Sequence, residues 1–134
     1  MNDRYFRLGA ILFMLTGLIH IAVHLGAISF AKTIPPIFEN MMNTTIAEGK
    51  SVYDFYIGFS VVMGLMLFAF GWQTWNFAKA NTLIFKLKIE TTLISLIAFG
   101  LTICYFPLVP IVFVGTASFL FVWSSIRVIQ LTKS

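Results

Sequence analysis

Between Glu90 and Arg127 the chain carries no charged side chain for 36 residues, numbered 91–126, which read TTLISLIAFGLTICYFPLVPIVFVGTASFLFVWSSI. As one helix this segment would measure about 54 Å, whereas the hydrocarbon core of a bilayer is about 30 Å thick. It must therefore fold back once. Pro107 and Pro110 supply the break, because proline removes a backbone donor and clashes with the preceding turn of a helix. A re-entrant hairpin is the alternative to two full crossings.

Two further apolar segments precede this pair. Residues 8–30 contain no Asp, Glu, Lys or Arg, and residues 55–77 form an apolar run between Asp54 and Lys79. Each is long enough for one crossing. A cleaved signal peptide is the competing interpretation of the first segment, but its apolar region is longer than the usual 7–15 residues or so. The predicted spans are 8–30, 55–77, 84–106 and 108–129.

The composition is that of a membrane protein. Of 134 residues, 59% are hydrophobic and 10% are charged, whereas soluble domains carry roughly 25% charged residues. We therefore predict one all-α domain over residues 1–134, a four-helix transmembrane bundle. The single cysteine, Cys104, excludes an intrachain disulfide and a cysteine-based metal site. The basic residues are scattered singly, so we expect no nucleic-acid partner.

The distribution of Lys and Arg predicts the orientation. Only Lys32 and Lys50 fall on one side of the predicted spans. The other basic residues fall on the opposite side: Arg4, Arg7, Lys79, Lys86, Lys88, Arg127 and Lys133. The positive-inside rule then places both termini in the cytoplasm and the protein in the cytoplasmic (inner) membrane.

Two lysines lie near the start of the third predicted span, where their charged groups must reach the membrane surface. We expect Lys86 and Lys88 to run their stems along the apolar surface toward the lipid headgroups. Glu90 follows Lys86 by four residues, a spacing typical of an ion pair at the end of a helix.

The first loop, on the extracytoplasmic side, contains a short amphipathic pattern. Pro35-Pro36 and Glu48-Gly49-Lys50 are turn and cap signals. Between and beside them lie five apolar residues with helical spacing: Ile37, Phe38, Met41, Met42 and Ile46. This spacing predicts a short amphipathic helix that lies along the membrane surface.

The histidines of the first span are the main candidates for chemistry. His20 and His24 are four residues apart and therefore share one helical face. Asp54 opens the second span at nearly the same depth as His24. A carboxylate beside an imidazole fixes its tautomer, so His24, Asp54 and a tyrosine would suit a metal or proton site. The candidate tyrosines are Tyr53, Tyr56 and Tyr105.

A simpler interpretation explains the same residues without chemistry. The histidines would donate hydrogen bonds to neighbouring helices, and Asp54 would cap the second span. The residues Ile21-Ala22-Val23 between the histidines lack the glutamate of a metalloprotease motif. Two histidines on one helical face also cannot hold opposite sides of a haem. No complete catalytic set is present, so we expect no enzyme, and the sequence favours no cofactor.

Two short motifs resemble those of small bacterial four-span membrane proteins, distantly the DoxX-like group. The first is Gly17-Leu18-Ile19-His20, and the second is Tyr56-Ile57-Gly58-Phe59 at the opening of the second span. The resemblance covers mainly residues 8–77. It implies a four-span fold and assigns no reaction.

Two functional hypotheses follow from the sequence. The first is a non-enzymatic accessory subunit that associates with itself or with a larger membrane protein through small residues. Those residues are Gly9, Gly17, Gly58, Gly64 and Gly71. The alternative is a subunit that binds a metal, a redox group or an apolar ligand such as a quinone or lipid. Its site would be His20, His24, Asp54 and the neighbouring tyrosines. A transport role lacks the buried acid or broken helix that would motivate it.

Overall fold

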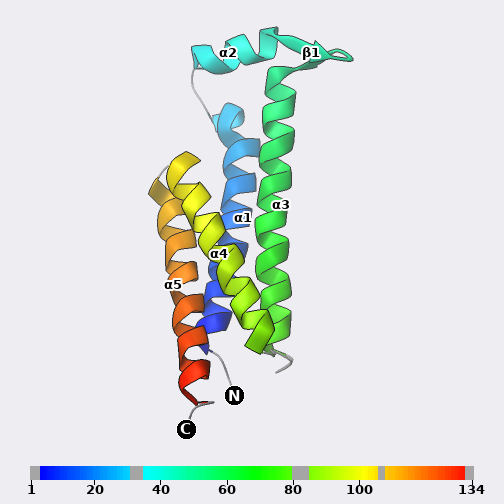
Figure 1. The fold of residues 1–134 in the computed structure, drawn as a ribbon. Helices are drawn as coiled ribbons and strands as arrows, with labels where there is room; N and C mark the ends of the chain where they lie inside the picture. The colour runs from blue at the N-terminus through cyan, green and yellow to red at the C-terminus, as the bar shows by residue number, and fades with distance from the viewer. Residues whose placement is uncertain (1–3, 31–34, 80–84, 106–107, 132–134) are drawn as a thin grey trace. The chain divides into compact units, whose positions relative to one another are not determined.

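Four long helices make up most of the chain in the computed structural model, which describes residues 4–30, 35–79, 85–105 and 108–131 (Figure 1). These helices are α1 (Arg4–Phe30), α3 (Val52–Lys79), α4 (Phe85–Tyr105) and α5 (Leu108–Leu131). Each contains a segment long and apolar enough to cross a membrane. The predicted all-α fold with four spans is confirmed, and the chain is a multi-pass membrane protein.

The predicted break in the long apolar segment is confirmed. Helix α4 ends at Tyr105 and α5 begins at Leu108, while Pro107 lies outside the described residues. Pro110 lies in the first turn of α5. A proline is tolerated there, because the first amide groups of a helix have no partner within it.

The first loop contains the predicted short helix and, in addition, a small hairpin. The elements are α2 (Pro36–Asn43), β1 (Thr45–Ala47) and β2 (Lys50–Ser51), the two strands being antiparallel. Ile46, which we expected on the amphipathic helix, lies in β1 instead. The helix ends because Thr44 is extended, with φ −97° and ψ 111°. Glu48 and Gly49 have φ of 50° and 76°, the two positive values that a tight hairpin turn requires.

The chain forms two compact units. The first, here called the core unit, comprises Met1–Thr16 and Leu67–Ser134; the second, the ladder unit, is Gly17–Met66. In the core unit, aromatic side chains of α1 and α5 pack together. The ring centroids of Phe6 and Phe121 are 4.7 Å apart, and those of Phe13 and Phe121 are 5.9 Å apart.

Glycines allow close packing within the core unit. A Cβ at Gly9 would lie 2.6 Å from a ring carbon of Phe121, and one at Gly71 would lie 2.6 Å from the carbonyl oxygen of Ala10. The lack of a side chain at these positions lets α1 approach its neighbours. Helices associate in membranes largely through such van der Waals contact, because lipid is as apolar as the helices themselves.

Buried hydroxyl groups line the contact between α4 and α5. The Oγ1 of Thr92 and the Oγ of Ser125 are 2.9 Å apart, and the Oγ of Ser118 donates to the carbonyl oxygen of Ser95 at 2.9 Å. All four residues are buried. Hydrogen bonds between helices stabilise a membrane bundle, since these groups find no partner in hydrocarbon. We call these four residues the hydroxyl seam.

Lys88 does not run along the membrane surface, so that prediction is wrong. It is 4% exposed, its Nζ donates to the Oγ of Ser124 at 3.5 Å, and it lies over the ring of Phe6 at 5.6 Å from the centroid. These partners on α5 and α1 replace the water that the ammonium group loses. Lys86 is exposed and pairs with Glu90 at 3.9 Å, as predicted.

Candidate ligand site on the first and third helices

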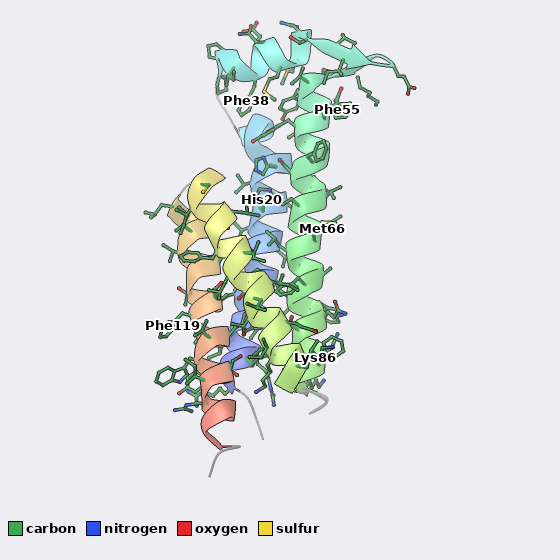
Figure 2. All side chains as sticks on the ribbon, viewed as in Figure 1. His20, Phe38, Phe55, Met66, Lys86 and Phe119 are labelled. Carbon is green, nitrogen blue, oxygen red and sulfur yellow. The ribbon has the colours of Figure 1, made fainter. Side chains whose placement is uncertain are left out.

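The two histidines of α1 lie in contact within the ladder unit. Their ring centroids are 4.4 Å apart with an interplanar angle of 57°. The contact follows from the sequence, because residues four apart lie one above the other on a helix. Both side chains are half-buried. Figure 2 labels His20 on α1.

Tyr56 of α3 extends the contact from one helix to the next. Its ring meets His24 edge-on, with centroids 5.3 Å apart and an angle of 71°. Tyr53 follows at 6.3 Å from Tyr56. Phe38, on α2, lies 5.9 Å from Tyr53 and 6.1 Å from Tyr56. A continuous series of five rings results: His20, His24, Tyr56, Tyr53 and Phe38, here called the aromatic ladder.

Asp54 makes its hydrogen bonds outside the ladder. Its Oδ2 accepts from the backbone N–H and the hydroxyl group of Ser51, both at 2.9 Å, and the Ser51 Oγ accepts from the Asp54 N–H at 3.1 Å. This reciprocal pattern is a capping box at the start of α3. On a helix, residues 54 and 56 are separated by about 200°, so their side chains leave opposite faces. The structure therefore shows Asp54 as a cap, as the simpler interpretation expects.

The remaining predicted site residues occupy separate places. Tyr105 is the last residue of α4, in the core unit, and its side chain lies outside the described residues. In the ladder unit, a Cβ at Gly64 would lie 2.9 Å from the carbonyl oxygen of Gly17 and 2.5 Å from Cγ1 of Ile21. These glycines bring α1 and α3 together beneath the ladder. A Cβ at Gly58, in contrast, would meet no atom within 4 Å.

The ladder offers two kinds of interaction to a ligand. Its ring faces suit stacking, while its imidazole nitrogens and phenol oxygens donate or accept hydrogen bonds. Among the residues that the structure describes, no group of three or more His, Cys, Asp or Glu side chains gathers.

Three features of the structure were not predicted from the sequence. Phe38 was expected on an amphipathic helix, but its contact with the tyrosines of α3 was not. The hydroxyl seam and the burial of Lys88 were also missed. The spacing of Lys88, Thr92 and Ser95, at i, i+4 and i+7, was the available signal, because it places three polar side chains on one stripe of an apolar helix.

Comparison with known proteins adds no relative: no family model, no curated protein and no solved structure matches the chain. The DoxX-like resemblance stays a prediction.

Proposed function

We propose that the chain is a non-enzymatic protein of the cytoplasmic membrane that binds an apolar ligand with a hydrogen-bonding ring, a quinone by chemical class, at the aromatic ladder. The observation that supports this proposal is the unbroken contact of His20, His24 and Tyr56 across two helices, with each ring half-buried. The ladder therefore keeps part of its ring surface accessible at one place.

The chemistry of the ladder matches that of a quinone head. A planar ring stacks on imidazole or phenol faces, and its carbonyl oxygens accept hydrogen bonds from N–H and O–H groups. Polar side chains inside a membrane-spanning segment are costly and often face a functional site, and His20 and His24 lie in such a segment. An isoprenoid tail would lie among the lipid chains.

The ligand hypothesis has more support than the partner-binding hypothesis. The glycines proposed for partner contact include Gly9, Gly64 and Gly71, and each of these already contacts a neighbouring element of the same chain. They cannot also receive a second protein without rearrangement. A Cβ at Gly58, in contrast, would meet nothing within 4 Å.

For the orientation, we propose that both termini are cytoplasmic, on the strength of the Lys and Arg distribution. Lys32 and Lys133, which contribute to that distribution, lie outside the described residues. A reporter fused after Ser134 that is active only in the cytoplasm tests this. Activity of a periplasmic reporter at the same position would contradict it.

The proposed ligand can be identified directly by extracting protein that has been purified in mild detergent. We expect an organic extract to contain a quinone in stoichiometric amount, and the His20→Gln/His24→Gln variant to lose it. Phe119→Leu is the matched control, because it breaks an exposed ring pair with Trp123 on α5, at 6.4 Å. An absorbance spectrum and metal analysis complete the test. If the protein contained a bound metal that the histidine variant lost, the ladder would be a metal site and not a quinone site. An extract without ligand would contradict the proposal.

A further inference from the structure

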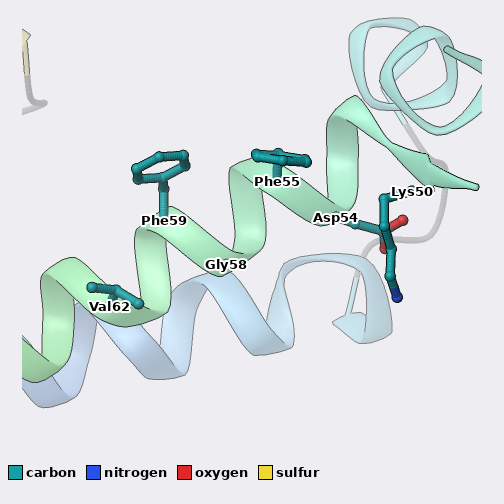
Figure 3. Close-up of a pocket in the computed structure, with 6 residues that line it drawn as sticks. All are labelled: Lys50, Asp54, Phe55, Gly58, Phe59 and Val62. Carbon is teal, nitrogen blue, oxygen red and sulfur yellow. The ribbon is translucent and has the colours of Figure 1, made fainter. Parts of the chain in front are cut away.

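A second candidate site lies at the start of α3 and shares no residue with the ladder. It is a groove of about 420 Å³, lined by Lys50, Asp54, Phe55, Gly58, Phe59 and Val62 (Figure 3). Its volume is within the range of roughly 300–1,000 Å³ that is typical of small-molecule sites. The lining is almost entirely apolar apart from the two charged side chains at the hairpin end.

The apolar part of the groove is a stripe along one face of the helix. Phe55, Phe59 and Val62 occupy positions i, i+4 and i+7, and all three side chains are exposed. Gly58 also lines the groove, and a Cβ there would meet nothing within 4 Å. The space beside the two phenylalanines is therefore open to an extended hydrocarbon chain.

The polar end of the groove carries one cation and one anion. Lys50 belongs to β2, and Asp54 belongs to the first turn of α3. The capping box holds the Asp54 carboxylate through its hydrogen bonds from Ser51. A carboxylate fixed in this way is preorganised for a cationic ligand group, and the ammonium group of Lys50 suits a phosphate.

We propose that this groove binds a phospholipid with a phosphoethanolamine headgroup. Its phosphate pairs with Lys50, its ammonium group donates hydrogen bonds to Asp54, and one acyl chain lies over Gly58 along Phe55 and Phe59. The end of a membrane-spanning helix lies at headgroup level, where such a lipid presents both charges. A choline headgroup has no N–H to donate, and a glycerol headgroup has no cation for Asp54.

The site is tested by native mass spectrometry of the whole protein in mild detergent. Ethanolamine, choline and glycerol phospholipids with identical acyl chains are added in equal amounts. We expect the ethanolamine lipid to be retained most. Gly58→Leu fills the groove and should remove bound lipid of every headgroup. Gly100→Leu on α4 is the matched control, because a Cβ there also meets nothing within 4 Å. Thermal unfolding of both variants verifies that each is folded.

The headgroup contacts are tested separately. Asp54→Asn keeps an acceptor oxygen for the cap and removes the charge. We expect it to lower the ratio of bound ethanolamine to glycerol lipid about two- to fivefold, the size of one exposed ion pair. Lys50→Gln should lower retention of both lipids by a similar factor.

Equal lipid retention in Gly58→Leu and Gly100→Leu would overturn the proposal, and so would lipid retention that does not depend on the headgroup. So would a dimer that Gly58→Leu abolishes, because a second copy of the chain would then occupy the groove.

Discussion

The core unit and the ladder unit use aromatic residues in different ways. Every apolar side chain that is buried within the described residues belongs to the core unit: Phe6, Ala10, Phe13, Ala78, Val114, Ala117 and Phe121. The rings of the aromatic ladder also touch one another, but they stay half-buried. Rings enclosed on all sides contribute packing, whereas rings left partly open remain available to a ligand. We therefore expect stability and ligand binding to respond to different substitutions.

The largest expected effect is a loss of stability on emptying the centre of the core unit. Phe121 is fully buried and contacts Phe6, Phe13 and Gly9. Phe121→Ala should lower the free energy of unfolding toward the lower end of the ~3–5 kcal/mol typical of such changes, since the cavity term persists in a membrane while transfer from water contributes less. Unfolding in a detergent titration measures this change in the free energy of unfolding. Phe119→Ala, at an exposed position of the same helix, should change it little, and equal losses would contradict the comparison.

The next largest loss of stability is expected at glycines that lie at helix contacts in each of the two units. Gly71→Ala would bring a Cβ within 2.6 Å of a backbone oxygen of Ala10, and Gly64→Ala within 2.9 Å of the backbone oxygen of Gly17. Because backbone atoms cannot turn aside, each substitution should cost about 1–3 kcal/mol by forcing the helices apart. The same unfolding measurement applies. Gly100→Ala, with open space around it, should be neutral or stabilising, and a loss as large as that of Gly71→Ala would show that helix separation is not the cause.

A smaller effect is expected in the hydroxyl seam. Thr92→Val removes the hydrogen bond to Ser125 and keeps the shape of the side chain. Hydrogen bonds between membrane helices contribute about 0.6 kcal/mol on average, so a loss of that size is expected. A double-mutant cycle with Ser125→Ala isolates the contact. Thr116→Val is the control, since that hydroxyl bonds only within its own helix, to the carbonyl of Val112. A coupling energy of zero would show that the contact of Thr92 with Ser125 adds nothing to stability.

The helices could be predicted from the sequence because a membrane span depends on a local property. A charge-free run of sufficient length must cross the bilayer, whatever surrounds it. The contact of His20 with His24 was equally local, since it follows from their spacing. The end of α2 at Asn43 was harder to predict, because Thr44 is extended there and a hairpin follows with positive φ at Glu48 and Gly49.

The contacts between distant segments could not be predicted. Asp54 and Tyr56 lie at one depth, but which of them faces His24 depends on the rotation of α3, and the capping box with Ser51 fixes that carboxylate elsewhere. Lys88 is buried where it meets Ser124, 36 residues away, and the ring of Phe6. A spacing rule gives the face of a helix and does not identify the element that covers it.

The most direct test of the proposed ligand site measures stability with and without ligand. A short-chain quinone that binds only the folded protein should raise the free energy of unfolding by about 2.7 kcal/mol at one hundred times its dissociation constant. We predict this increase for the natural sequence and for Phe119→Leu. In His20→Gln/His24→Gln we predict no increase, measured against the stability of that variant without ligand. The same increase in the histidine variant would contradict the assignment of the ladder as the site.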